Sequence, residues 1–266
     1  MDMETSYELD VSYGLEEVHS LLITALEKFD QVCRENGIYY SLHGGTLLGA
    51  ERNHKLIPWD DDIDVSMTRL EYKKLKEVTK KLYGVYYLDE ETMWFPRFVM
   101  KKGDSIVYID ILIWDYISGK RWQQQIKIGI LRAFQGMMKP HINYKRFGLL
   151  NRFLLLSTHI VGKLIPKRVQ LKWFHVIEER WLVGGKECIH RSNDAFKGVS
   201  YIFDKNYMDD YSELELEGKR YLVNQRYHEF LERNYGKNYL MPPPMVERRP
   251  EHEIMRANLS KSRPIR

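Results

Sequence analysis

Apolar residues recur at helical spacing near the N-terminus. Over 15–35 they fall every three or four positions on one face and are followed by an Asn-Gly pair, so this stretch predicts an amphipathic helix. A second helix is predicted over 68–82, because Thr68 and Glu71 have the spacing of a capping box. The residues between these two helices have a different pattern.

Short runs of β-branched and aromatic residues predict strands at 38–42, 63–67 and 106–114. Between the first two strands, HGGT at 43–46 predicts a turn that opens into a short helix over 47–52. This part of the chain therefore mixes strands with helices.

The rest of the chain is first helical and then mixed. The stretch 123–181 is helical in pattern, basic and only loosely amphipathic, whereas 211–223 predicts a hairpin around a Glu-Gly pair. A short helix is predicted over 227–235, ended by Gly236. The tail after Met241 opens with three prolines, so we expect it to be extended or loosely packed.

The net charge of +4 conceals a strong asymmetry along the chain. No acidic residue lies between Asp115 and Glu178, a segment that holds twelve lysines and arginines, so the rest of the chain carries 4 − 12 = −8. The basic residues of this segment are Lys120, Arg121, Lys127, Arg132, Lys139, Lys145, Arg146, Arg152, Lys163, Lys167, Arg168 and Lys172.

Three interpretations of this basic segment stay open. Its mixture of cations and apolar clusters is typical of a membrane-surface element, which predicts peripheral contact through 119–182 at the inner face of the cell membrane. It could instead form a solvated helical subdomain over the active site. A nucleic-acid surface is the third interpretation, but no DNA- or RNA-binding motif accompanies the charge, and no nucleic-acid partner is expected.

The compartment follows from what the sequence lacks. It has no run of roughly 20 apolar residues, the length that a membrane-spanning helix needs. The N-terminus is acidic and polar, unlike a secretory signal, and the two cysteines, Cys33 and Cys188, predict no disulfide. We therefore expect a soluble protein of the cytoplasm.

Four aspartates lie within five positions, at Asp60, Asp61, Asp62 and Asp64. Because side chains alternate along a strand, Asp62 and Asp64 are predicted to share one face while their neighbours enter the core. Two carboxylates on one face repel each other, and a bound divalent cation such as Mg²⁺ removes that cost. Asp110, a lone charge in the third predicted strand, could complete a three-carboxylate site.

The glycine pair upstream adds a second element. Gly44 and Gly45 permit close approach of a ligand to the backbone, and the N–H groups at the start of the following helix suit a phosphate. Taken singly, an acidic run is usually a solvated loop, and a glycine pair is usually an ordinary turn. Their coincidence with Asp110 favours a metal-dependent enzyme that moves a phosphate-bearing group.

These motifs resemble the LicD family of phosphocholine transferases, whose core the fukutin-type proteins share. The resemblance rests on HGGTLLGAER at 43–52, IPWDDDIDV at 57–65 and IDILIWDYI at 109–117, with weaker matches at 214–223 and 239–243. It implies an α/β (α+β) fold: a nucleotidyltransferase-like mixed sheet flanked by helices, with a helical basic subdomain.

The resemblance also implies a division of the chain. Residues 1–118 would form the nucleotidyltransferase-like catalytic core and 119–182 the basic helical subdomain. The C-terminal part, 183–266, would pack back on the core.

Roles for individual residues follow from the same resemblance. Asp62 and Asp64 match the family's metal aspartates, and Asp110 matches its third acidic position. All three would be metal ligands and catalytic residues, with Mg²⁺ as the expected ion and Mn²⁺ as its alternative. Asp110 would act as a general base or as a ligand of a second metal ion. The residues expected to bind the substrate or to shape its site are His43, Gly44, Gly45, Thr46, Arg52 and Trp59.

Family members typically use a CDP-activated donor and release CMP. The expected reaction is transfer of phosphocholine, or of a related phospho-alcohol, from CDP-choline or a similar donor to a glycan hydroxyl. The glycan could be lipid-linked, as in lipopolysaccharide or teichoic acid decoration. Two alternatives stay open: a nucleotidyltransferase that moves NMP from an NTP, and an inactive binding protein associated with membrane or glycan.

A choline head group would need recognition of its own. Four aromatic residues could cage its ammonium by cation–π contact, although packing in the core is the competing interpretation. They are Tyr39, Tyr40, Trp94 and Trp114.

Overall fold

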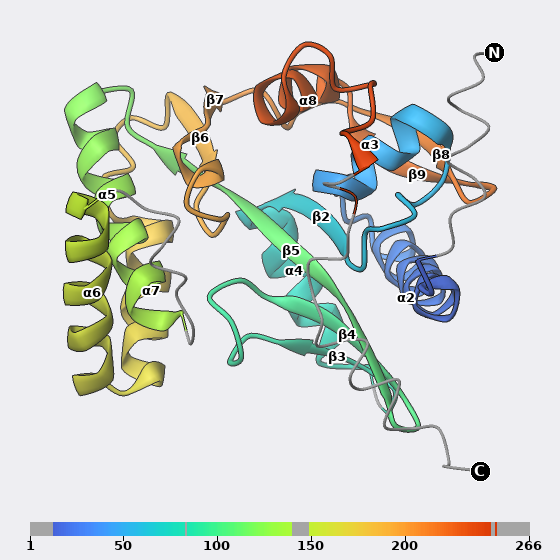
Figure 1. Cartoon of the computed structure of the whole chain (residues 1–266), viewed down its shortest axis with the longest axis horizontal. Helices are drawn as coiled ribbons and strands as arrows, with labels where there is room; N and C mark the ends of the chain where they lie inside the picture. The colour runs from blue at the N-terminus through green and yellow to red at the C-terminus, as the bar shows by residue number, and fades with distance from the viewer. Residues whose placement is uncertain (1–12, 83, 140–148, 246–247, 249–266) are drawn as a thin grey trace. The chain divides into compact units, whose positions relative to one another are not determined.

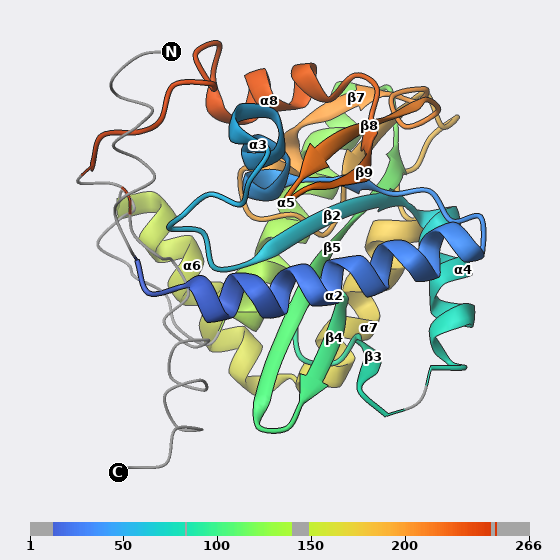
Figure 2. The same cartoon turned by 90° about the vertical axis from the view of Figure 1, so that its right-hand side faces the viewer.

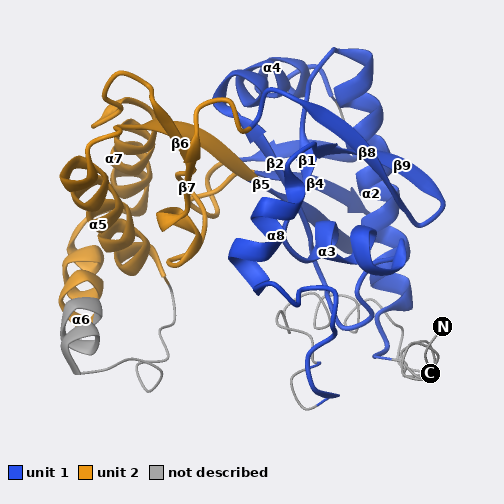
Figure 3. Ribbon diagram, turned by 90° about the horizontal axis from the view of Figure 1, so that it is seen from above, with its two compact units in different colours: residues 1–89, 97–111, 208–266 blue, residues 90–96, 112–207 orange. Residues whose placement is uncertain are grey.

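The computed structural model describes residues 13–82, 84–139, 149–245 and 248. The chain packs as two compact units (Figure 3). Unit 1 takes its described residues from 1–89, 97–111 and 208–266, and unit 2 takes them from 90–96 and 112–207. The division into a catalytic core, a basic subdomain and a C-terminal part concerns function and stays a prediction.

Unit 1 is built on a sheet with the strand order β1-β2-β5-β4-β3, of which Figure 1 labels β2 to β5. The pairs β1–β2, β3–β4 and β4–β5 are antiparallel. The strands are β1 (Ser41–Leu42), β2 (Ile63–Thr68), β3 (Tyr86–Asp89), β4 (Arg97–Lys102) and β5 (Ser105–Ile117), the last of which continues into unit 2. The α/β fold with a mixed sheet flanked by helices is confirmed.

Helix α2 runs across this sheet (Figure 2) and packs on it through its apolar face. Phe29 of α2 is fully buried and meets Phe98 of β4 edge to face, with ring centroids 5.5 Å apart. The capping box of α4 is confirmed, because Oγ1 of Thr68 accepts a hydrogen bond from the N–H of Glu71 at 3.3 Å. The helices of unit 1 are α2 (Glu16–Glu35), α3 (Gly44–Asn53), α4 (Arg69–Thr79) and α8 (Tyr227–Tyr235).

Two predicted elements have different bounds. The strand predicted at 38–42 is reduced to β1, because the N–H of Tyr39 donates to a side-chain oxygen of Glu71 (3.0 Å) rather than to a neighbouring strand. The helix predicted at 47–52 begins earlier, at Gly44, so the glycine pair is its first turn. The glycine pair therefore belongs to the helix itself and is not a separate turn before it.

The predicted hairpin is confirmed as β8 (Tyr211–Leu216) and β9 (Lys219–Asn224). Its turn residues Glu217 and Gly218 both have left-handed backbone, with φ of 51° and 78°, as a tight two-residue hairpin requires. The side chain of Glu217 accepts a hydrogen bond from the N–H of Leu56 at 3.0 Å. The hairpin thereby holds the segment that leads into the aspartates.

The described residues of unit 2 form helices beside the end of β5 and two further short strands. Strand β6 pairs antiparallel with β5, with Asp115 opposite His190. The helical pattern predicted over 123–181 is confirmed in its described parts, whereas its residues 140–148 lie outside the described residues. The short strands were not predicted. The elements are α5 (Arg121–Met138), α6 (Leu149–Leu164), α7 (Lys167–Arg180), β6 (Cys188–Arg191), the 3-10 helix η2 (Gly198–Ser200) and β7 (Ile202–Asp204).

The basic segment is only partly described. Lys145 and Arg146 lie outside the described residues, and so does the side chain of Arg152. Lys127, by contrast, is fully buried. Within the part of the chain that the structure covers, no helix is long and apolar enough to cross a bilayer.

Candidate active site

Three aspartates meet in unit 1. Asp64 is the second residue of β2, Asp62 lies immediately before that strand, and Asp110 lies on the neighbouring strand β5. One carboxylate oxygen of each lies within 4.8 Å of the others. Asp62 and Asp64 are half-buried, and Asp110 is buried. The structure thus brings the predicted residues together, while their catalytic role stays a prediction.

This group could hold a metal ion. Three carboxylates are hard oxygen ligands, and Mg²⁺ binds such ligands at about 2.1 Å, so that neighbouring oxygens lie about 3–4 Å apart. The observed oxygens, within 4.8 Å of one another, lie near that spacing. The donor set fits a hard divalent cation, and the choice of Mg²⁺ stays a prediction.

The glycine pair has a steric reason in this structure. Gly44 has φ of +54°, and a Cβ there would collide with the carboxylate of Asp64. A Cβ on Gly45 would collide with the carboxylate of Asp60. Glycine at both positions therefore lets the first turn of α3 lie directly against two aspartates, and leaves its N–H groups close to the acidic group.

Asp64 is held by its backbone from two sides. Its N–H donates to Oγ1 of Thr46 at 3.0 Å, and its carbonyl accepts from the N–H of His43 at 3.0 Å. His43 and Thr46 are both buried, and the His43 ring lies 4.1 Å from that of Phe230. These contacts support Asp64, and direct phosphate contact by either residue stays a prediction.

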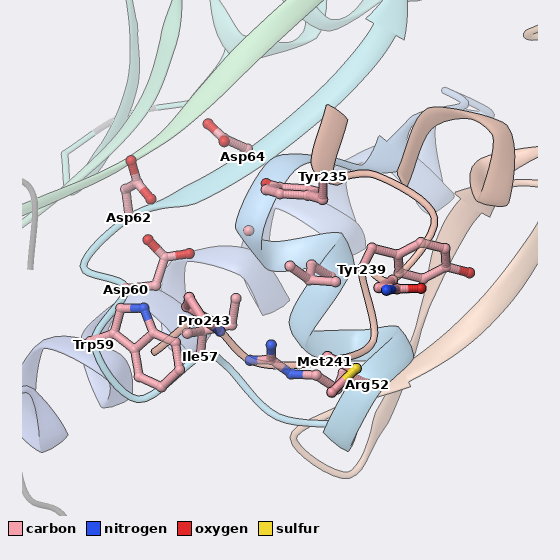
Figure 4. Close-up of a pocket in the computed structure, with 13 residues that line it drawn as sticks. Arg52, Ile57, Trp59, Asp60, Asp62, Asp64, Tyr235, Tyr239, Met241 and Pro243 are labelled. Atoms are coloured by element: carbon pink, nitrogen blue, oxygen red, sulfur yellow. The ribbon is translucent and has the colours of Figure 1, made fainter. Parts of the chain in front are cut away.

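A cavity of about 500 Å³ opens beside the aspartates. Figure 4 shows Asp60, Asp62 and Asp64 on one side of it, with Tyr235 and Tyr239 approaching from the C-terminal segment. The residues that line it all belong to unit 1. They are Gly45, Leu48, Arg52, Ile57, Trp59, Asp60, Asp62, Asp64, Tyr235, Asn238, Tyr239, Met241 and Pro243. The segment 239–243, which resembles the LicD family only weakly, thus contributes directly to the cavity wall.

Arg52 and Trp59 both line the cavity, while their contact with a substrate stays a prediction. The Arg52 guanidinium lies 5.8 Å from the centre of the Trp59 ring, and that of Arg248 lies 5.2 Å from it. Guanidinium groups can bind anionic phosphates, and carboxylates can bind a divalent cation. The two kinds of group together suit a phosphate-bearing ligand that binds with a cation.

Arg97 is a residue of the site that the sequence did not reveal. Nε of Arg97 donates to Oδ1 of Asp110 at 2.8 Å, and its guanidinium stacks on Tyr108 at 4.0 Å. The pKa of Tyr108 is raised by burial, and Asp110 and Asp62 add to the increase whereas Arg97 opposes it. Arg97 faces Asp110 across the β4–β5 register, a pairing that only knowledge of that register could have predicted.

The aromatic residues considered for a choline cage do not line the cavity. Tyr40, Trp94 and Trp114 are buried in packed cores, so the packing interpretation holds for them. Tyr39 is exposed and lies against Tyr211, with ring centroids 5.2 Å apart. The aromatic rings in the cavity wall belong instead to Trp59, Tyr235 and Tyr239.

Comparisons with known proteins agree with this geometry. Residues 37–131 match the family model described as LicD/FKTN/FKRP, nucleotidyltransferase domain, and this range includes the three aspartates. The chain is 27% identical over 262 residues to a lipopolysaccharide cholinephosphotransferase LicD of Haemophilus influenzae, covering 90% of this chain and 96% of that protein. It is also 27% identical over 94 residues to an uncharacterised protein of Rickettsia prowazekii, covering 32% of this chain and 35% of that protein. Residues 37–131 of this chain therefore form a LicD/FKTN/FKRP nucleotidyltransferase domain.

Proposed function

We propose that this protein transfers phosphocholine, or a related phospho-alcohol, from a CDP-linked donor to a glycan hydroxyl. The observation that carries the proposal is a group of three carboxylates, two of which, Asp62 and Asp64, line a cavity large enough for a nucleotide diphosphate. The Haemophilus relative is named as a lipopolysaccharide cholinephosphotransferase. Its name supports CDP-choline as the first donor to test and a surface glycan as the acceptor.

Asp62, Asp64 and Asp110 would hold the metal, with Mg²⁺ as the expected ion. When bound, the ion would neutralise negative charge on the diphosphate and on the departing CMP. The chain's own groups would orient the substrate. The first N–H groups of α3 carry a partial positive charge and are not covered by a side chain at Gly44. They would donate hydrogen bonds to a phosphate bound at this end of the helix.

Arg52 would bind the nucleotide side of the donor. Its guanidinium lines the cavity beside Trp59, and such a group can donate two parallel hydrogen bonds to a phosphate. Asp110, fixed by Arg97, would accept the proton of the attacking glycan hydroxyl or bind a second ion, and both roles stay open. In either case the residues act mainly by positioning and by electrostatic stabilisation.

The proposal is tested by incubating the purified protein with Mg²⁺ and CDP-choline, CDP-ribitol or CDP-glycerol, together with glycan acceptors. CMP release is expected with one of these donors. Asp64→Asn should lower the rate at least about 100-fold, because it removes one charged ligand of the ion. Asp104→Asn is the matched control, since Asp104 is an exposed aspartate of the same unit, in the turn between β4 and β5, and should leave the rate unchanged.

Two outcomes would replace this proposal. Release of pyrophosphate from an NTP, with transfer of NMP and no CMP from any CDP donor, would identify a nucleotidyltransferase, which uses the same type of metal site. Failure to release either product, together with saturable binding of a glycan or CDP donor, would identify a catalytically inactive binding protein.

A further inference from the structure

Helix α6 of unit 2 presents an apolar face to solvent. Leu164 is 80% exposed, and Leu156, Ile160 and Val161 are 46–53% exposed. At 100° per residue, these four side chains fall within an arc of about 140° around the helix. The face is therefore continuous, although aliphatic side chains are normally buried.

The opposite side of α6 explains why this face points outward. Gly162 lies on that side, and a Cβ there would collide with the backbone of Met137 in α5. The helix thus packs tightly on α5 through its glycine, and its bulky aliphatic residues are directed away from the contact.

Two cations lie on or close to this face in sequence, with no acidic residue in the same stretch. Lys163 is exposed on the edge of the same arc, and Arg168 is exposed at the start of α7. No aspartate or glutamate occurs between Asp115 and Glu178. We define the α6 surface as Leu156, Ile160, Val161, Lys163, Leu164 and Arg168.

We propose that the α6 surface docks on an anionic lipid bilayer. An aliphatic stripe bordered by cations complements the acyl boundary and the negative head groups of such a bilayer. Interfaces with a protein partner are instead depleted in lysine. Surfaces for nucleic acid use cations and aromatic stacking, and have no need of a central aliphatic stripe.

This docking goes beyond the transfer reaction and does not depend on it. The α6 surface lies in unit 2, whereas the cavity and the three aspartates lie in unit 1. A bilayer contact would bring the enzyme to the surface where a lipid-linked glycan is found.

The test is co-sedimentation of the full chain with vesicles. The protein should bind vesicles of phosphatidylcholine mixed with phosphatidylglycerol, bind vesicles of pure phosphatidylcholine much less, and lose affinity at high salt. Ile160→Asp/Leu164→Asp should weaken binding at least about tenfold, because it places two charges in the apolar stripe. Leu70→Asp is the matched control: Leu70 is 65% exposed on α4 of unit 1, and its substitution should leave binding unchanged.

A second variant tests the cations separately. Lys163→Glu/Arg168→Glu should abolish the salt-sensitive part of binding, whereas Lys101→Glu/Lys102→Glu, at two exposed lysines of β4, should leave it intact. Circular dichroism checks that each variant is folded, and CMP release without vesicles should equal that of the wild type, so docking and transfer fail independently. Absence of binding to anionic vesicles would overturn the proposal. Unchanged vesicle binding by the Ile160→Asp/Leu164→Asp variant would also overturn it. The same holds if this variant loses self-association of the protein instead of vesicle binding, because the α6 surface would then bind a second copy of the chain.

Discussion

Each unit of this protein gathers carboxylates, and the two groups have opposite surroundings. In unit 1, Asp62 and Asp64 are half-buried at the edge of a cavity, with Asp110 beside them. In unit 2, Asp115 and Glu178 are almost fully buried. The first group can be reached by a ligand, whereas the second is enclosed by protein.

The buried group is linked to its surroundings by hydrogen bonds. Oγ of Ser192 lies 2.5 Å from an oxygen of Asp115 and 3.1 Å from one of Glu178. The ammonium of Lys127, itself fully buried, donates to the carbonyls of Tyr116 and Glu178. A buried charge is tolerated when protein groups surround it in this way, so this network joins β5, α5, α7 and the residue after β6.

The comparison teaches that proximity of carboxylates alone does not identify a metal site. Exposure to a cavity and like charges held close together indicate a place for a cation, whereas burial among internal donors indicates a role in folding. Substitutions in the two groups should therefore have different consequences, for activity in unit 1 and for stability in unit 2.

The largest effect is expected from Lys127→Met. It removes the buried ammonium and leaves the carbonyls that it serves, so the free energy of unfolding should fall by about 3–5 kcal/mol. Chemical denaturation measures this change. Lys102→Met, at an exposed lysine of β4, is the control and should have little effect. A similarly small loss for Lys127→Met would show that the buried network contributes little to folding.

Gly44→Ala should separate activity from stability in unit 1. An alanine here would be strained by the left-handed backbone, and its Cβ would collide with the carboxylate of Asp64 and displace it. CMP release should therefore fall at least about 100-fold, which corresponds to about 2.7 kcal/mol. Gly103→Ala is a matched control, because Gly103 has φ of +61° but open space around it. Both variants should lose about 1–2 kcal/mol of stability from the backbone. Equal activity in the two would contradict the role of Gly44 in admitting Asp64.

Local patterns were enough to predict much of the acidic site. The DxD spacing fixed the shared direction of Asp62 and Asp64, and the lone charge of Asp110 in an apolar strand marked the third carboxylate. The capping box and the hairpin turn were likewise predicted, because each depends on a few neighbouring residues. Local determinants of this kind can be recognised in a single sequence.

Long-range pairings could not be predicted in the same way. Arg97 meets Asp110 only through the β4–β5 register, and Lys127 was counted among the cations of the basic segment, although it is fully buried. Strands β6 and β7 have only four and three residues and were overlooked. In each case the decisive partner lies far away in sequence.

The pH dependence of stability should expose the buried network further. Burial lowers the pKa of His190 to about 3, with a contribution from Lys127. The unfolded state, with a pKa near 6.5, binds this proton first, so stability is complete above about pH 6.5 and falls as the pH decreases toward 3. By pH 5 the loss should be about 2 kcal/mol.

Denaturation at pH 7 and pH 5 checks this, with His190→Asn as the comparison. The charges nearest to His190 in this packing are those of Lys127, Glu178 and Arg191. The variant should lose less stability than the wild type over the same interval, whatever its stability at pH 7. Equal losses would assign the acid sensitivity to other groups.

The smallest effect is expected from Arg97→Gln in the acidic site. Arg97 holds a positive charge 2.8 Å from an oxygen of Asp110, where it repels a cation bound by the same carboxylates. Its removal should strengthen Mg²⁺ or Mn²⁺ binding about fivefold, or about 1 kcal/mol, since the surroundings are partly hydrated. Calorimetric titration measures the affinity, and Lys101→Gln, further along β4, controls for net charge. Weaker binding would mean instead that Arg97 orients Asp110 for the ion, and that geometry outweighs charge at this carboxylate.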